Sequence, residues 1–203
     1  PNGAGKSTIL KSVMRLLPAD RGRIEIDGHA LSALSQRQLA QTVSYVPQEL
    51  RGTMPWTVRE FVLMGRYPYV STFREYSRRD QQVVDEVMAL TGVTPLADRE
   101  MTHLSGGEGQ TVMITAALAQ EADLLLLDEP GTFLDPRHQD EINALLHRLA
   151  RQEDKAILMV THDINAAAIN SDRVLALKDG RLVFGGSPAE LMCNDVLKRI
   201  FEK

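Results

Sequence analysis

The chain opens with the stretch Pro1-Asn2-Gly3-Ala4-Gly5-Lys6-Ser7-Thr8, and this stretch decides the fold. It matches all but the first position of the pattern Gly-x-x-x-x-Gly-Lys-Ser/Thr, in which backbone N–H groups point inward at phosphate oxygens. Lys6 supplies positive charge for the β- and γ-phosphates, Ser7 can bind Mg²⁺, and the helix expected over Lys6–Leu17 aims its positive end at the nucleotide. A chance glycine-rich turn before a helix, the alternative, does not call for the Lys-Ser pair. The predicted phosphate-binding residues are Asn2, Gly3, Ala4, Gly5, Lys6, Ser7 and Thr8.

A second predicted feature is a pair of acidic residues after a buried strand. Leu124–Leu127 and Ile157–Val160 are uninterrupted apolar runs, which suit central strands covered on both faces. Asp128 and Glu129 follow the first run at its carboxyl end, where open α/β sheets bind ligands. We expect Asp128 to face Mg²⁺ and Glu129 to polarise the attacking water, a weak prediction without the phosphate loop. His162 follows the second run at the same sheet edge, where it can contact the γ-phosphate; a structural cap is the alternative.

The third feature is a helix start that contains two glycines, within Leu104–Glu108. Ser105 and Glu108 have the spacing of a capping box. Gly106 and Gly107 are poor helix formers, but they leave backbone N–H groups bare for an anion. An ordinary helix cap is the alternative. A second phosphate-type helix start in one chain suggests a nucleotide that is shared between two copies.

The rest of the chain alternates strand-like runs with helical stretches, which predicts α/β layering around a parallel sheet. We expect strands at Arg23–Asp27 and Thr42–Val46, helices at Trp56–Met64, Gln81–Thr91 and Asp140–Leu149, and a hairpin of Arg173–Leu177 with Arg181–Phe184, followed by two short helices.

Composition narrows the class of protein. The chain has 203 residues, of which 43% are hydrophobic and 25% charged, with a net charge of −4. These values are typical of a globular protein with a real core and give no bulk attraction to nucleic acid. The only cysteine is Cys193, which excludes a disulfide scaffold. No apolar run approaches the ~18 residues that a membrane-spanning helix needs.

Aromatic side chains and arginines gather in one short stretch between Trp56 and Arg79. The ordinary interpretation is that these side chains form the hydrophobic core and the solvent-exposed face of a small helical insert. The alternative is a docking surface, because aromatic residues and arginine are enriched at protein interfaces. The residues concerned are Trp56, Phe61, Tyr67, Tyr69, Phe73 and Tyr76, with Arg59, Arg66, Arg74, Arg78 and Arg79.

Taken together, these motifs resemble the ATP-binding subunits of ABC transporters over nearly the whole chain. The family's elements occur in order: the phosphate loop, Val46-Pro47-Gln48 as Q-loop, Leu104–Glu108 as signature, Leu124–Glu129 as Walker B, Leu134-Asp135 as D-loop and His162 as switch histidine. Within the family, Gly65-Arg66-Tyr67-Pro68 and Phe133–Gln139 are similar to importers of iron–siderophore complexes, haem and cobalamin. The chain departs from the pattern at Gly131, where threonine is usual, and around Glu108–Thr111, where arginines are common.

The resemblance implies the fold class and the domain organisation. It implies an α/β P-loop NTPase of ABC-ATPase type, with a mostly parallel sheet core and an inserted helical subdomain. Residues 1–203 would form one ABC ATPase domain, with residues 1–52 and 120–203 as catalytic core and residues from about 53 to 119 as helical subdomain. We expect the chain to be a fragment, with the strand that feeds the phosphate loop and an N-terminal antiparallel subdomain missing.

The resemblance also implies roles for individual residues, with ATP and Mg²⁺ as cofactors. Glu129, His162 and Gln48 would be catalytic, while Ser7, Gln48 and Asp128 would hold Mg²⁺. Ser105, Gly106, Gly107 and Asp135 would join the phosphate-loop residues in nucleotide binding, with the signature residues serving the ATP held by a partner copy.

The implied function is that of an ATP-hydrolysing importer subunit, which couples ATP hydrolysis to uptake of an iron–siderophore complex, haem or cobalamin. Its partners would be a second ATPase copy in a head-to-tail dimer, integral membrane permease subunits and, indirectly, an extracytoplasmic substrate-binding protein, with no nucleic acid. It would lie peripherally on the cytoplasmic face of the inner membrane. The alternatives are a soluble ABC ATPase without a transport role and an inactive nucleotide-binding fragment.

Overall fold

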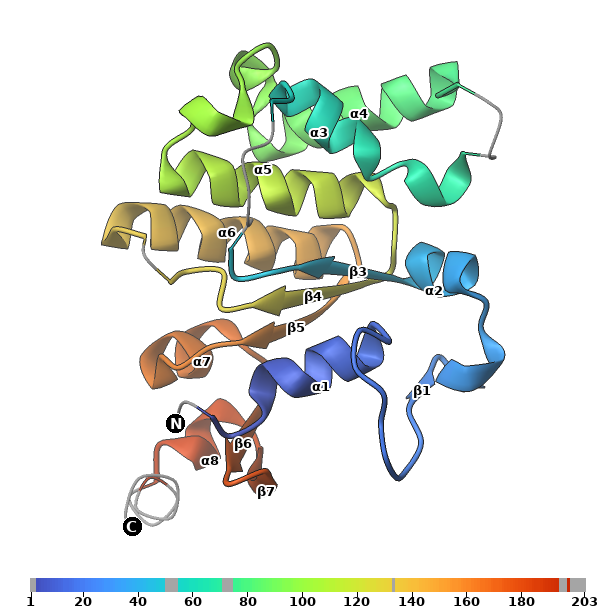
Figure 1. Cartoon of the computed structure of the whole chain (residues 1–203). Helices are drawn as coiled ribbons and strands as arrows, with labels where there is room; N and C mark the ends of the chain where they lie inside the picture. The colour runs from blue at the N-terminus through green and yellow to red at the C-terminus, as the bar shows by residue number, and fades with distance from the viewer. Residues whose placement is uncertain (1–2, 50–54, 71–74, 133, 194–196, 198–203) are drawn as a thin grey trace. The chain divides into compact units, whose positions relative to one another are not determined.

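The computed structural model describes residues 3–49, 55–70, 75–132, 134–193 and 197 (Figure 1). The chain divides into two compact units, Pro1–Asp20 with Val160–Lys203 and Arg21–Met159, and each unit is described by itself. In chain order, the helices and strands are α1 (Lys6–Val13), β1 (Glu25–Ile26), β2 (His29–Ala30), α2 (Gln36–Thr42), β3 (Val43–Val46), α3 (Val58–Met64), α4 (Arg78–Thr91), α5 (Gly106–Ala119), β4 (Leu124–Asp128), α6 (Pro136–Gln152), β5 (Ala156–Val160), α7 (Ile164–Asn170), β6 (Val174–Lys178), β7 (Arg181–Gly186) and α8 (Pro188–Leu191).

A parallel sheet organises the larger unit. Strands β3 and β4 pair in parallel with Val43 opposite Leu124, and β5 follows in the order β3-β4-β5. Strand β4 is buried from Leu125 onward, as its apolar run predicts. The same prediction for Ile157–Val160 is wrong, because Leu158 is 38% exposed. In the described part of the chain β5 is the end strand, and it packs on the core through alternate side chains.

Three helices of the larger unit, α3, α4 and α5, pack against one another, and α5 also contacts β3 (Figure 1). Helix α4, which contains the helix predicted at Gln81–Thr91, buries Val83, Val84 and Met88 on one face. Helix α3 begins at Val58, two residues later than expected, because the Thr57 side chain accepts a hydrogen bond from the Glu60 N–H and caps the helix there.

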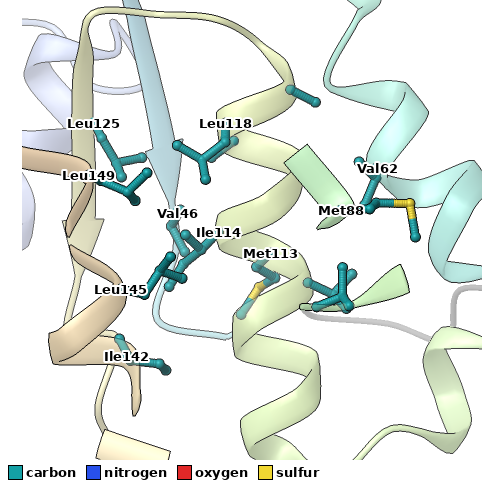
Figure 2. Packing of buried hydrophobic residues seen from close by; sticks show 14 of the residues in the cluster. Val46, Val62, Met88, Met113, Ile114, Leu118, Leu125, Ile142, Leu145 and Leu149 are labelled. Carbon is teal, nitrogen blue, oxygen red and sulfur yellow. The ribbon is translucent and has the colours of Figure 1, made fainter. Parts of the chain in front are cut away.

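The hydrophobic core of this unit lies between the sheet and helices α5 and α6. Figure 2 shows Val46 of β3 and Leu125 of β4 facing Ile114 of α5 and Leu145 and Leu149 of α6. Burying side chains of this size stabilises the fold by about 1.5–3 kcal/mol each. The core therefore fixes the ends of β3 and β4, from which the candidate site residues emerge.

A buried arginine ties the end of α3 to the end of α5. The Arg66 side chain is 3% exposed and forms ion pairs with Asp80 at 3.0 Å and with Glu121 at 2.7 Å. It also donates a hydrogen bond to the Ala119 carbonyl at 2.6 Å, and its guanidinium lies 4.0 Å from the centre of the Tyr69 ring. Arg66 is thus a structural residue of the helical region and does not belong to its exposed surface.

The smaller unit contains α1, α7, α8 and an antiparallel hairpin of β6 and β7. The predicted hairpin is confirmed, and at its turn Asp179 and Gly180 both have positive φ. Helix α1 is shorter than predicted: it ends at Val13, since Arg15 adopts a left-handed backbone conformation with φ of +55°. Across the described residues, no helix combines the length and the apolar character that crossing a membrane requires.

Candidate nucleotide-binding site

The phosphate loop is described from Gly3 onward, while Asn2 lies outside the described residues. Gly3 and Gly5 have φ values of +79° and +91°, which glycine adopts without the steric cost of a β-carbon. Gly5 caps α1 with no side-chain hydrogen bond. A helix start without a side-chain acceptor suits an anionic ligand, because the backbone N–H groups of its first turn need an external acceptor.

The predicted side chains of the smaller unit lie at two helix starts. Lys6 and Ser7 occupy the first turn of α1 and are half-buried, and Thr8 is exposed. His162 is exposed and precedes α7, but the cap of that helix is Asp163, which accepts a hydrogen bond from the Ala166 N–H at 3.0 Å. The alternative prediction, that His162 is the structural cap, is therefore wrong.

In the larger unit, Asp128 ends β4 and is 4% exposed. The Tyr45 hydroxyl on the neighbouring strand β3 donates a hydrogen bond to Asp128 Oδ2 at 3.3 Å. Burial raises the pKa of Tyr45 to about 12, and the charge of Asp128 adds to the effect. The tyrosine thus keeps its proton at neutral pH and fixes the orientation of a buried carboxylate.

Glu129 lies next to Asp128 and is held by two donors. Gln48 Nε2 lies 3.3 Å and Thr132 Oγ1 3.0 Å from Glu129 Oε2. Glu129 also has a φ of +51°, a left-handed conformation that costs a non-glycine residue about 1–3 kcal/mol and that is concentrated at functional sites. The structure therefore brings together Gln48, Asp128 and Glu129, three of the predicted residues, at the ends of β3 and β4.

The glycine-containing helix start has the predicted capping box. Ser105 Oγ accepts from the Glu108 N–H at 3.3 Å, and the Ser105 N–H donates to Glu108 Oε2 at 2.7 Å. The bond from the Ser105 N–H keeps the pKa of Glu108 below its ordinary value, and the Ser105 side chain adds to the effect. Arg99 contacts Glu108 Oε1 at 3.1 Å, so an arginine from outside the helix supports this turn. Gly106 and Gly107 form the first two positions of α5.

Asp135 caps α6, the helix that packs beside α5. Its Oδ1 accepts from the His138 N–H at 3.0 Å, and its Oδ2 lies 2.8 Å from His138 Nδ1. The backbone bond and the ring contact keep the pKa of Asp135 below its ordinary value. The carboxylate is therefore ionised at neutral pH and can accept a hydrogen bond from the ring nitrogen that faces it.

Three residues of this region have no role in the sequence prediction: Tyr45, Thr132 and His138. Thr132 follows Glu129 by three residues, a spacing at which a hydroxyl can reach back, and it stands beside Gly131, where the family's threonine is missing. Tyr45 is two residues before Pro47 on β3, a strand parallel to β4. Its contact with Asp128 depends on the register of these two strands, which the sequence alone does not reveal. His138 follows Asp135 by three residues, the spacing at which the side chain of an N-cap residue accepts a hydrogen bond from the backbone N–H of the first helical turn.

The arrangement can perform two kinds of chemistry. The smaller unit offers the loop, the Lys6 charge and the α1 start to phosphate groups. The larger unit offers an oriented carboxylate at Glu129 with an amide beside it, which is what activation of a water molecule requires. A phosphate site and a water-activating carboxylate are the elements of nucleotide hydrolysis.

Comparison with known proteins agrees with this chemistry. The family model described as ABC transporter matches residues 1–132. The chain therefore belongs to the ABC transporter family, as one of its ATP-binding and ATP-hydrolysing members, and both the predicted resemblance and the predicted fold class are confirmed.

Individual relatives indicate which kinds of ABC protein the chain is similar to. The chain is 41% identical over 202 residues to the iron(3+)-hydroxamate import ATP-binding protein FhuC of Bacillus subtilis, covering 100% of this chain and 75% of that protein. An inward-facing transporter assigned to the metal-chelate ABC type has a TM-score of 0.88 at 31% identity, covering 99% of this chain and 74% of the other. A dimeric ATP-binding cassette, MJ0796 with ADP and Pi in a post-hydrolysis state, has a TM-score of 0.78 at 28% identity, covering 93% and 82%.

Proposed function

We propose that the chain is the ATP-hydrolysing subunit of an importer for an iron–siderophore complex, haem or cobalamin. The observation that carries the catalytic part is the Glu129 carboxylate, which Gln48 and Thr132 hold beside buried Asp128. The cargo class rests on the 41% identity to an iron(3+)-hydroxamate import protein. In this proposal residues 1–52 and 120–203 form the catalytic core, and residues from about 53 to 119 form the helical subdomain.

Nucleotide binding falls to the loop and to the start of α1. The loop from Asn2 to Thr8 wraps the phosphates, and the Lys6 ammonium offsets their negative charge. Ser7, Gln48 and Asp128 would hold Mg²⁺, and their hydroxyl, amide and carboxylate oxygens are the ligands that this ion prefers. When bound, the ion neutralises charge on the β- and γ-phosphates.

Hydrolysis falls to Glu129 and His162. Glu129 accepts the proton of the attacking water, and the hydrogen bonds from Gln48 and Thr132 keep its carboxylate in one orientation. His162 is exposed, and in this proposal its ring donates a hydrogen bond to the γ-phosphate. Tyr45 holds Asp128 in place while these steps occur.

The proposed assembly contains two copies of the chain arranged head to tail. Ser105, Gly106 and Gly107 at the start of α5 contact the nucleotide of the second copy, with Asp135 close to it. Permease subunits in the membrane dock on the aromatic and arginine-rich stretch, in which Tyr67 is 77% exposed; Phe73 and Arg74 of that stretch lie outside the described residues. An extracytoplasmic binding protein delivers the cargo, the chain lies on the cytoplasmic face of the membrane, and no nucleic acid takes part.

The test of the catalytic proposal is Glu129→Gln. Loss of a general base lowers the rate by about 10²–10⁴-fold, whereas the amide leaves the phosphate loop untouched. We therefore expect ATP binding at the parental affinity and loss of phosphate release. The matched control is Glu153→Gln, which removes an exposed carboxylate at the far end of α6 and should hydrolyse ATP normally. Near-parental hydrolysis by Glu129→Gln would refute the role of this residue.

The cargo is tested separately in cells. Uptake of radio-iron as the hydroxamate complex and uptake of labelled cobalamin are compared between cells that carry the parental chain and cells that carry Glu129→Gln. Loss of uptake of one compound identifies the cargo, whereas unchanged uptake of both, and of labelled haem measured in the same way, would refute the importer proposal.

A further inference from the structure

Two helix starts of the larger unit lie against each other. Helix α5 begins after Ser105, and α6 begins after Asp135. A β-carbon placed on Gly106 would lie 3.7 Å from a methyl group of Leu134. A β-carbon placed on Gly107 would overlap the His138 ring, with Cγ only 2.6 Å away. The imidazole of α6 therefore occupies the space that a side chain at Gly107 would take.

The ring that fills this space is held from its other side. Both carboxylate oxygens of Asp135 are engaged by His138, one by its backbone N–H at 3.0 Å and one by ring Nδ1 at 2.8 Å. The contact to Nδ1 fixes the rotation of the imidazole, and ring atoms Cγ, Cδ2 and Nε2 lie where a side chain at Gly107 would be. The ring is 34% exposed, so it lies at the rim of the packing between the two helices.

Glycines weaken the first turn of a helix and bring no side chains that could pack it in place. The contact with His138 compensates for this lack of packing. Gly106 is exposed and Gly107 is buried, and each glycine costs about 1 kcal/mol of helix stability relative to alanine and brings no side chain to fix the turn. A side chain from a neighbouring helix can supply the missing packing. His138 does so from α6, with its ring in the space that a side chain at position 107 would take.

We propose that His138 is a positioning residue, which sets the place of the first turn of α5 relative to Asp135. The inference rests on the proposed function, in which that turn contacts the nucleotide of the second copy. Displacement of a binding group by ~1 Å can lower a rate by about 10²-fold. His138 should therefore affect turnover strongly and affect the binding of ATP to the subunit's own phosphate loop little.

Two substitutions separate the parts of the His138 side chain. His138→Asn places an amide nitrogen near the position of Nδ1 and keeps the bond to Asp135, but it removes the ring from Gly107. His138→Phe keeps a ring against Gly107 and loses the bond. We expect kcat for ATP hydrolysis to fall about tenfold or more in His138→Asn, as for a displaced binding group, with KM for ATP essentially unchanged. His138→Phe should stay close to the parental kcat.

Two results would overturn the proposal: a parental kcat in His138→Asn, or a loss in His138→Phe as large as that in His138→Asn, which would show that a ring against Gly107 is not what sustains turnover. Ser105→Arg, measured in parallel, separates this outcome from failure of the proposed function. If Ser105→Arg leaves ATP-driven dimer formation and hydrolysis intact, the signature role itself is wrong. If it abolishes them while His138→Asn does not lower kcat, only the role of His138 is wrong.

A stability measurement tests the contact without any activity. Gly107→Ala should lower the melting temperature, because its β-carbon overlaps the His138 ring. The double variant Gly107→Ala/His138→Ala should recover part of that loss, since the obstructing ring is gone. Strictly additive melting shifts would show that the ring does not occupy this space in solution, and the proposal would fail.

Discussion

Replacement of Arg66 by methionine should destabilise the protein far more than replacement of any surface arginine. Methionine keeps the length and the apolar stem of the side chain but removes the guanidinium. Three polar contacts disappear with it: those to Asp80, to Glu121 and to the Ala119 carbonyl. The substitution leaves the former partners of the guanidinium without it, and the burial of these partners determines how much stability is lost.

The magnitude follows from the exposure of those partners. Removal of one member of a buried ion pair typically costs about 3–5 kcal/mol. Asp80 is 9% exposed, but it keeps hydrogen bonds from the Ser77 N–H and hydroxyl at 2.8 and 2.6 Å. Glu121 is 38% exposed and keeps its contact with Arg79. We therefore expect the lower end of the range, about 3 kcal/mol, which for a chain of this length lowers Tm by about 6–12 °C.

The assay is urea and thermal unfolding of the purified protein, with Arg79→Met as the matched control. Arg79 shares Glu121 with Arg66, at 3.1 Å, but its side chain is 59% exposed. Exposed ion pairs contribute about 0–1 kcal/mol, so the control should unfold close to the parent. Equal shifts for Arg66→Met and Arg79→Met would refute the argument that burial, and not charge pairing as such, sets the cost.

Two further predictions concern a close helix contact and a titration. Gly65→Ala should lower stability by about 1–3 kcal/mol, because its β-carbon would overlap the Ala116 carbonyl oxygen, while Gly109→Ala, which faces open space in α5, should be neutral or stabilising; thermal melts that rank the two variants the other way would contradict this. Absorbance titration should show a tyrosine ionising near pH 12 that is absent in Tyr45→Phe. Because the folded-state pKa of Tyr45 exceeds the usual value of about 10, its contribution to stability is present below about pH 10 and is lost between about pH 10 and 12. The same titration curve for the parent and Tyr45→Phe would refute the prediction that Tyr45 has a raised pKa.

Local patterns in the sequence predicted the elements whose structure depends on neighbouring residues. The apolar run before Asp128 does form a buried strand, and the Ser105–Glu108 spacing does form a capping box. Both follow from contacts within a few residues, which a pattern of residue types contains. The helix expected to reach Leu17 ended at Val13 instead, since the left-handed backbone at Arg15 has no signature in the composition of that segment.

The contacts that orient the candidate site were not predictable in the same way. Tyr45 reaches Asp128 across 83 residues of sequence, and this contact exists only because β3 and β4 pair in one particular register. A shift of one residue would turn the tyrosine to the other face of the sheet. His138 meets Gly107 through the packing of two helices, and the sequence of neither helix specifies that approach.

The capping box at α5 also shows how one helix start can serve two purposes that the sequence presented as alternatives. The box uses the N–H of Ser105, the residue before the helix, and the N–H of Glu108, the third residue of the helix. It does not use the N–H groups of Gly106 and Gly107, which lie between them. An ordinary cap and an anion-binding turn are therefore compatible in the same five residues. The start of α1 follows a different rule, because Gly5 provides no side-chain cap at all. A cap confined to the third position stabilises the helix and still leaves its first two donors to a ligand, provided that a neighbouring side chain such as His138 supplies the packing that the glycines lack.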